Sequence, residues 1–288
     1  NKVKPDFSTK IKELKVKNFI LSDVFFKVKI KDNFIDINPL TLEIFDGKLS
    51  GIYKVDMRGN KAKFKIEQQI NNLELSYLFD KKENIIKGTA SLLTNISFEG
   101  VKKNEILQSI SGSKMLYGQN LIFNKYDIDE ILSQYEKTQQ IDLLDIGAVL
   151  LAGPLAGLLT HSVKFAMLKH AVEKKGSTKI KEFSSLWKIR NSIAIAKDVA
   201  LKTEKNIIAL KGKIDFESKK FKGIEIAALN KQGCAKYMQV LSGSFNTNDI
   251  NTNGNTVEMF LSPLKSIIKG TNELFEDCEK FYKGRIKW

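Results

Sequence analysis

Two histidines and two cysteines are the residues of this chain best suited to metal binding or to nucleophilic chemistry. His161 and His170 stand nine residues apart, whereas two histidines that share a metal ion on a helix are four residues apart. Cys234 and Cys278 are too few and too widely separated for a structural zinc site. We therefore expect structural or surface histidines and predict no metal site. The cysteines could form a disulfide or remain two buried thiols.

The acidic residues and serines also lack a catalytic arrangement. The run "DIDE", residues 127–130, has three carboxylates but neither the alternating oxygen ligands nor the glycine of a calcium loop. Acidic residues are favoured at a helix N-terminus, so a helix start is the better interpretation. No G-x-S-x-G motif, Walker loop or dinucleotide-binding motif occurs. The sequence therefore predicts a protein that is not an enzyme and has no cofactor.

The composition indicates a folded protein with a basic surface. The 288 residues are 42% hydrophobic and 28% charged, with a net charge of +14. Such a charge attracts nucleic acid, anionic membranes or acidic polymers. Most of the 18 phenylalanines stand at alternating apolar positions rather than among basic residues, so we expect no nucleic-acid binding. Lysines in runs such as "KVKIK", residues 27–31, are expected on solvated strand faces.

The first 125 residues have the pattern of an antiparallel β-meander. Apolar residues recur at every second position, and turn signals such as "KDN", "FDGK" and "RGNK" separate the runs. This predicts a sheet with one apolar face. The residues expected on that face are Phe26, Val28, Ile30, Leu40, Leu42, Ile44, Tyr53, Val55, Phe64, Ile66, Leu92, Ile96 and Phe98.

From residue 126 the apolar spacing becomes helical. "YDIDEILSQYEK", residues 126–137, predicts a short amphipathic helix, and residues 161–176 predict a second one. "STKIKEFSSLWKI", residues 177–189, predicts a third, with Ser177 as its N-cap. Strand patterns return after Arg190, and a last helix is expected after Pro263. We expect one continuous domain, cut from a longer protein, with a β-meander at 1–125, a helical insertion at 126–188 and a continuing sheet at 189–288.

A series of phrases, in order along the chain, resembles the C-terminal region of AsmA-like proteins of the Gram-negative envelope. The resemblance begins near residue 40 and covers most of the chain. The phrases are "FDGKLSGIYKVDMRG", "IKGTASLLTNISFEG", "ISGSKMLYGQNLIFNKYDIDEIL", "LLDIGAVLLAGPLAGLLT", "FSSLWKIRNSIAIAKDVALKTEKNIIALKGKIDFES", "NKQGCAKYMQVLSGSF" and "CEKFYKGRIKW".

The resemblance implies a mainly β protein of the α+β class, with an elongated, curved antiparallel sheet that has an apolar concave face and helices that cover or cap it. It implies a non-enzymatic module that binds phospholipid, or another anionic envelope lipid, in an apolar β-groove and transfers it between the inner and outer membranes. A periplasmic location is implied, with a tether to the inner membrane that precedes these residues. An oxidising periplasm favours a Cys234–Cys278 disulfide.

The resemblance also bears on the partners of the protein. Lysines on the rim of a groove would meet anionic headgroups at a membrane surface. The alternative function is a structural or partner-binding domain that assists outer-membrane protein assembly, with envelope proteins as its partners.

The uncharged stretch "IGAVLLAGPLAGLLT", residues 146–160, is the candidate cap of that groove. It is shorter than the roughly 20 apolar residues of a membrane-spanning helix, and Pro154 interrupts it. Two interpretations remain: a kinked buried helix that covers the sheet, or an apolar lid that touches lipid. The predicted cap residues are Val149, Leu150, Leu151, Pro154, Leu155, Leu158 and Leu159.

Overall fold

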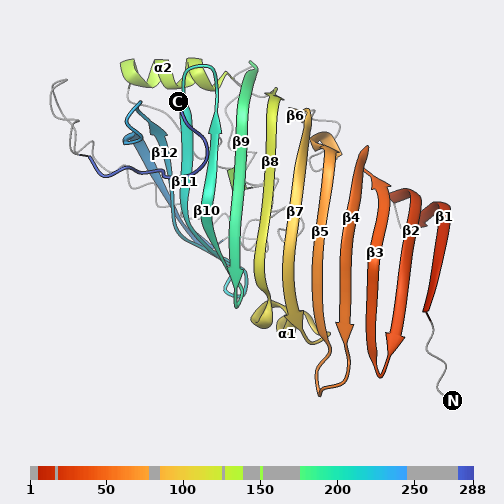
Figure 1. The fold of residues 1–288 in the computed structure, drawn as a ribbon. Helices are drawn as coiled ribbons and strands as arrows, with labels where there is room; N and C mark the ends of the chain where they lie inside the picture. Colours follow the sequence, from red (N-terminus) through yellow and green to blue (C-terminus); the bar gives the residue numbers. More distant parts are fainter. Residues whose placement is uncertain are drawn as a thin grey trace, which may run out of the picture.

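The computed structural model describes residues 6–16, 19–77, 85–124, 127–138, 150–151, 176–244 and 278–288. Within these ranges the protein is mainly β, with a single 13-stranded sheet and two α-helices. Every strand pair is antiparallel. The fold class predicted from the sequence, a mainly β protein with a curved antiparallel sheet, is confirmed (Figure 1).

The strands follow one another across the sheet in chain order, except that β5 pairs with β7 and the short β6 pairs with β8. The N-terminal strands are β1 (Asp6–Val16), β2 (Phe19–Lys31), β3 (Phe34–Ile44), β4 (Gly47–Asp56), β5 (Lys63–Glu74), β6 (Ile86–Lys87), β7 (Thr89–Glu99) and β8 (Ser111–Phe123). The later strands are β9 (Thr178–Arg190), β10 (Ile193–Lys202), β11 (Ile207–Asp215), β12 (Lys220–Leu229) and β13 (Ala235–Ser244). The helices are α1 (Lys103–Ser109), α2 (Ile128–Thr138) and a 3-10 turn at Leu75–Tyr77.

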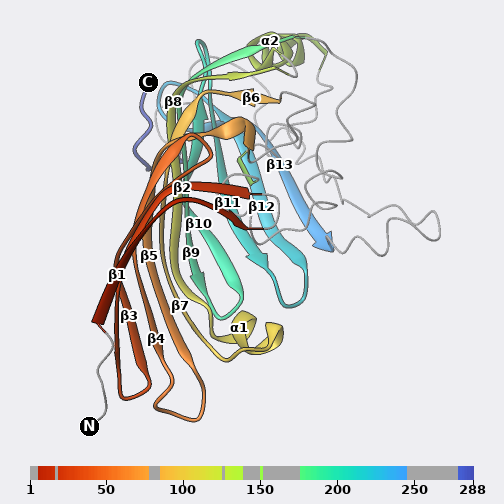
Figure 2. The same cartoon turned by 90° about the vertical axis from the view of Figure 1, so that its right-hand side faces the viewer.

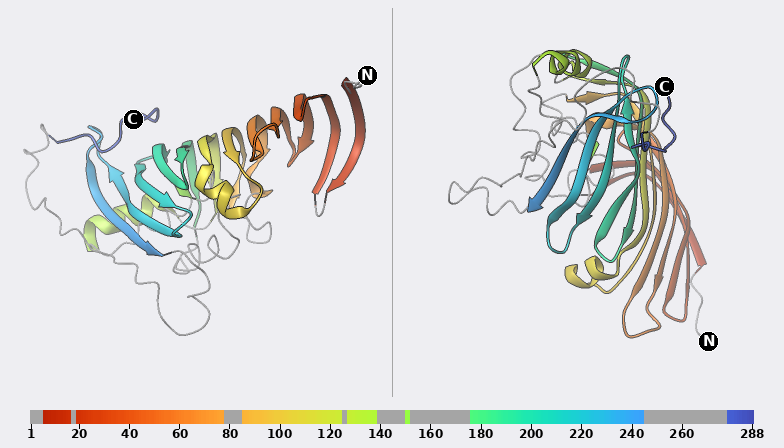
Figure 3. Two further views of the ribbon diagram at one scale, coloured as in Figure 1. Left: turned by 90° about the horizontal axis from the view of Figure 1, so that it is seen from below. Right: turned by 90° about the vertical axis from the view of Figure 1, so that its left-hand side faces the viewer.

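The sheet is curved, and its two sides carry different segments (Figures 2 and 3). Helices α1 and α2 lie on the same side, near opposite ends of the strands. The C-terminal segment, residues 278–288, lies on the other side. The sheet therefore has one side that meets the helices and another that meets the C-terminus.

Tight turns connect the hairpins that the sequence predicted. Asp32 and Asn33 in "KDN", and Phe45 and Asp46 in "FDGK", have positive φ values of 47°, 60°, 54° and 58°. Two consecutive residues with positive φ form the turn whose twist matches that of the paired strands. These turns fix the registers of β2 with β3 and of β3 with β4.

The helix predicted at residues 177–189 is wrong, because this segment is β9. Ile180, Phe183 and Trp187 have a spacing that fits a helix, but the segment pairs with β8 on one side and β10 on the other. The predicted helical insertion therefore does not extend to residue 188, because β9 begins at Thr178. Helix α2 was predicted, whereas α1 was not. The helices expected at 161–176 and after Pro263 lie outside the described residues.

The C-terminal segment is fastened to the sheet by a disulfide between Cys234 and Cys278, with a Cα–Cα distance of 6.2 Å. The Phe281 backbone N–H donates to the Gly233 carbonyl at 2.9 Å. Phe281 and Ile286 are buried in a second apolar cluster, separate from the main core. Its other buried members are Ala200, Ile207, Ala209, Ala227 and Leu229.

The same segment also encloses a buried carboxylate, Asp198. The Tyr282 hydroxyl donates to it, the Ser184 hydroxyl donates to it at 3.1 Å, and the Arg285 Nε forms an ion pair with it at 3.3 Å. Burial first, and then the hydrogen bond to Asp198, raises the pKa of the Tyr282 phenol well above its usual value. The C-terminal segment thus stabilises the sheet through apolar packing and supplies the Asp198 carboxylate with hydrogen-bond partners.

We expect the disulfide to contribute a large part of the stability of this region. It closes a loop of 44 residues, which corresponds to about 4 kcal/mol of loop-closure free energy. Cys278→Ser should lower the free energy of unfolding in urea by up to this amount. Reduction of the wild-type protein should give the same loss and should not affect the variant. Equal stability of the oxidised wild type and the variant would contradict this role.

The carboxyl group of Asp215, at the end of β11, should make the stability of the protein depend on pH. Burial raises the pKa of the Asp215 carboxyl, but hydrogen bonds from Lys222, at 2.6 Å, and from Ser218 outweigh this and hold the pKa at about 2. A lowered carboxyl pKa adds stability above the unfolded value near 3.8, and this stability is lost as the pH falls from about 4 to 2. Asp215→Asn should therefore cost about 1–2 kcal/mol at pH 6 and almost nothing at pH 2, measured by urea unfolding at each pH.

Candidate functional site

The strand registers place the predicted apolar residues on one face of the sheet. Directly opposed residues of antiparallel strands point to the same side, and so do residues two apart on one strand. The opposed pairs include Phe26–Leu40, Val28–Ile37, Leu42–Leu49, Tyr53–Ile66, Val55–Phe64, Ile66–Ile96, Phe64–Phe98 and Ile70–Leu92. Ile30 and Ile44 follow Val28 and Leu42 by two residues. We call the side that carries these residues the apolar face.

Register shifts keep this face apolar where the simple alternation breaks. Ile37 and Leu40 are three residues apart, as are Ile70 and Leu73, so an undisturbed strand would point the members of each pair to opposite sides. The pairing shifts between the two members in both cases. Asn72, inside the second shift, has a φ of 55°. The sheet therefore accommodates an extra residue without turning an apolar side chain away from the apolar face.

Helix α2 is anchored over the end of this face by the acidic run "DIDE". Asp127 Oδ1 accepts a hydrogen bond from the Glu130 backbone N–H at 3.0 Å, as an N-cap does. Asp129 accepts hydrogen bonds from the Thr203 hydroxyl and from Asn206 Nδ2, both in the turn between β10 and β11. The prediction that these acidic residues mark the start of a helix is confirmed. They hold α2 so that Ile128 and Leu132 are buried in the main core.

Two of the predicted cap residues, Leu150 and Leu151, are described, and both are fully buried in the same core. The Leu150 carbonyl accepts a hydrogen bond from Ser185 Oγ at 2.9 Å, and Ser185 Oγ accepts one from Trp187 Nε1 at 3.0 Å. Sequence reasoning missed Ser185 and Trp187 because it assigned them to a helix. The other predicted cap residues, Val149, Pro154, Leu155, Leu158 and Leu159, lie outside the described part of the chain.

Burial of the apolar face changes along the sheet. Over β9–β12 its apolar side chains are fully buried, for example Phe183 at 2%, Leu201 at 0% and Ile226 at 0% exposure. Over β2–β7, three of the thirteen predicted residues are buried, namely Val28, Leu42 and Leu92. The other ten are half-buried. The face is therefore closed at its C-terminal half and partly accessible at its N-terminal half.

A line of polar residues crosses the apolar face from β5 to β8. Gln68, Thr94 and Lys114 stand directly opposite one another, and we call them the polar row. The row continues to Gly51 on one side and to the buried Trp187 on the other. Thr94 is only 7% exposed, and its hydroxyl has no hydrogen-bond partner among the described residues. Sequence reasoning missed this row because Thr94 occupies one position in an otherwise apolar alternation.

Tyr53 extends the polar row onto β4. Gly51 has no side chain, and a Cβ there would lie 3.0 Å from Tyr53 Cε2, so the tyrosine ring covers the glycine. The Tyr53 hydroxyl donates to Gln68 Oε1. Burial raises the pKa of this phenol, which therefore stays protonated at neutral pH. This hydrogen bond occupies the oxygen of the Gln68 amide and leaves its nitrogen as a donor.

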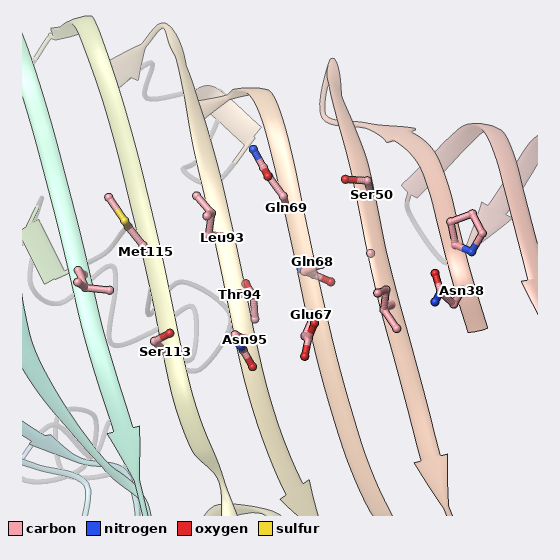
Figure 4. Close-up of a pocket in the computed structure, with 14 residues that line it drawn as sticks. Asn38, Ser50, Glu67, Gln68, Gln69, Leu93, Thr94, Asn95, Ser113 and Met115 are labelled. Atoms are coloured by element: carbon pink, nitrogen blue, oxygen red, sulfur yellow. The ribbon is translucent and has the colours of Figure 1, made fainter. Parts of the chain in front are cut away.

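The opposite face carries the strand lysines. It also carries a shallow hollow (Figure 4). Lys27, Lys29, Lys63 and Lys65 are exposed there, as expected for solvated strand positions. Ser50, Gln69, Leu93, Asn95 and Met115 line the hollow, which has a volume of about 540 Å³. Because the lysines alternate with the predicted apolar residues, they lie on the opposite face, whereas Lys114 lies on the apolar face. Contact between the strand lysines and anionic headgroups stays a prediction.

Two kinds of feature are absent from the described residues. They include no group of three or more His, Cys, Asp and Glu side chains that could hold a metal ion. No helix among them is long and apolar enough to cross a membrane. His161 and His170 lie outside these residues.

Comparison with known proteins identifies a family. A sequence model of the AsmA family matches residues 1–194. The match includes the first 40 residues, which the quoted phrases do not reach, and it ends within β10. No curated protein and no solved structure matches the chain. Placement of the chain in the C-terminal region of the family stays a prediction.

Two neighbouring leucines of β7 test the assignment of the faces. Leu92 is 8% exposed on the apolar face, whereas Leu93 is 42% exposed on the opposite face. Leu92→Ala should lower the free energy of unfolding by about 2–4 kcal/mol, because it leaves a cavity in the core. Leu93→Ala should cost less than about 1 kcal/mol. Urea denaturation of both variants measures the difference, and equal losses would contradict the register of β7.

Proposed function

Because the chain belongs to the AsmA family, which is associated with the bacterial envelope and generally non-enzymatic, we propose that the protein binds phospholipid on its apolar face and transfers it between the inner and outer membranes. Membership by itself indicates an envelope-related role in lipid transport or assembly. The observation that carries the finer proposal is the partial burial of the apolar face over β2–β7. A continuous apolar surface that protein covers only in part is suited to acyl chains.

The apolar side chains of the half-buried region are suited to contact with acyl chains. On β5 and β7, Phe64 stacks on Phe98 with ring centroids 4.8 Å apart, and Ile66 stands opposite Ile96. These side chains offer no polar atom, so attraction for a ligand would come from removal of apolar surface from water, which is non-directional. Such a surface holds a flexible hydrocarbon chain without fixing its identity.

The apolar face continues onto β1, the first of the described strands. Phe7 stands opposite Val28 and is 48% exposed, and its ring contacts Phe26 edge-to-face at a centroid distance of 6.3 Å. The opposite end, over β9–β12, is closed. We therefore expect lipid to lie along the rows of β1–β7 rather than over β9–β12.

The proposed location is the periplasm. The Cys234–Cys278 disulfide supports this, because such bonds persist in oxidising compartments. The tether to the inner membrane stays part of the proposal and rests on the resemblance alone. The net charge of +14 supports a preference for anionic lipid surfaces, and salt should weaken this preference.

A charge on the apolar face should block lipid transfer. Ile96 is half-buried on the apolar face, and Leu93 is exposed on the opposite face of the same strand. Ile96→Asp should reduce the rate of transfer of fluorescent phosphatidylglycerol between vesicles at least tenfold, because a desolvated carboxylate would face the acyl chains. Leu93→Asp adds the same charge and should change the rate less than twofold.

Thermal melting of both variants establishes that each is folded before transfer is measured. Unchanged transfer by a folded Ile96→Asp variant would contradict the proposal. It would favour the alternative of a partner-binding domain for outer-membrane protein assembly, in which the apolar face would not need to carry lipid.

A further inference from the structure

We propose that the polar row of Gln68, Thr94 and Lys114 is a binding site for the phosphate and ester oxygens of a lipid whose acyl chains lie on the apolar face. This inference rests on the proposed function and adds a position for the polar part of the ligand. It assigns to the apolar face a site that recognises an amphiphile rather than a hydrocarbon.

The polar row offers hydrogen-bond donors on three neighbouring strands. The Thr94 hydroxyl can donate, the Gln68 amide nitrogen can donate because its oxygen accepts from Tyr53, and the Lys114 ammonium group carries a positive charge. Adjacent strands are about 4.8 Å apart, so the three side chains span roughly 10 Å across the sheet. Several donors and one cation in a row match a ligand with several acceptor oxygens and a negative charge.

Besides this row of donors, the unpartnered hydroxyl of Thr94 also points to a ligand. A buried hydroxyl without a partner destabilises the folded state, and a valine of the same shape would avoid this cost. Thr94 stands between Leu92 and Ile96 on its own strand and between Gln68 and Lys114 on the neighbouring strands. The two flanking side chains are long and flexible, so their movement can give a ligand oxygen access to the hydroxyl.

The polar row also coincides with a boundary in burial. Toward α2, the apolar residues next to the row on β5 and β7 are buried, with Ile70 at 6% and Leu92 at 8% exposure. Toward α1, the corresponding residues, Ile66 and Ile96, are half-buried. The accessible part of the apolar face therefore begins at the row. A lipid whose oxygens bind the row would place its acyl chains over Ile66, Ile96 and the Phe64–Phe98 pair.

Removal of one hydroxyl separates recognition of the polar group from recognition of the hydrocarbon. Thr94→Val keeps the shape of the side chain, and Thr41→Val, on the opposite face of β3, is the matched control. The probes are a short-chain phosphatidylglycerol, a long-chain alkane and glycerol 3-phosphate, each titrated into delipidated full chain by calorimetry. Thr94→Val should weaken the phospholipid about tenfold and leave the alkane within twofold. Thr41→Val should change neither.

Three other outcomes would overturn the polar row, the proposed function or the assignment of the site to a lipid. If wild type binds the alkane but Thr94→Val leaves the phospholipid unchanged, or weakens both probes equally, the polar row is overturned and the proposed function stands. If wild type binds neither the phospholipid nor the alkane, the proposed function fails and the row fails with it. If glycerol 3-phosphate binds as tightly as the phospholipid and depends on Thr94, the site takes a free phosphate, and its assignment to a lipid is overturned.

Discussion

The antiparallel register is the constraint on which the rest of this structure depends. Side chains alternate between the two sides of a strand, so a shift by one residue would exchange the apolar and polar sides of that strand. The chain avoids such an exchange across β2–β7 even where three residues separate successive apolar positions, because the pairing shifts at the same places. One continuous apolar face results, which runs from β2 to β7.

The two sides of the sheet are closed by different means. The C-terminal segment covers the far side over β10–β12 with a disulfide, two buried apolar side chains and the Asp198 hydrogen bonds. The apolar face is covered over β9–β12 by residues that include Ile128, Leu132, Leu150 and Leu151. The C-terminal half thus forms a two-sided core that supports the sheet. The N-terminal half has one apolar side that is only half-buried, and a sheet supported at one end can leave that side for a ligand.

Local pattern predicted the N-terminal half of the fold because its strands alternate regularly and its turns carry Asn, Asp and Gly. The same method failed at β9, where Ile180, Phe183 and Trp187 satisfy a helical spacing and only pairing with β8 and β10 decides the structure. The contact of Asp198 with Tyr282 joins residues 84 positions apart, which no local pattern reveals. The missing hydrogen-bond partner of Thr94 likewise depends on three neighbouring strands together, so no local pattern reveals it.

A polar row within an apolar face needs a physical reason, because each buried polar group there costs free energy that a leucine or valine would not. The Tyr53 hydroxyl donates to Gln68, and in the closed part of the core Trp187 donates to Ser185, so these polar groups have partners. Thr94 differs, and it stands where the buried and half-buried parts of the face meet. For stability alone, a valine at this position would avoid the cost of the unpartnered hydroxyl. A face that holds an amphiphile requires a polar group there, because the polar end of the ligand must leave water together with its chains.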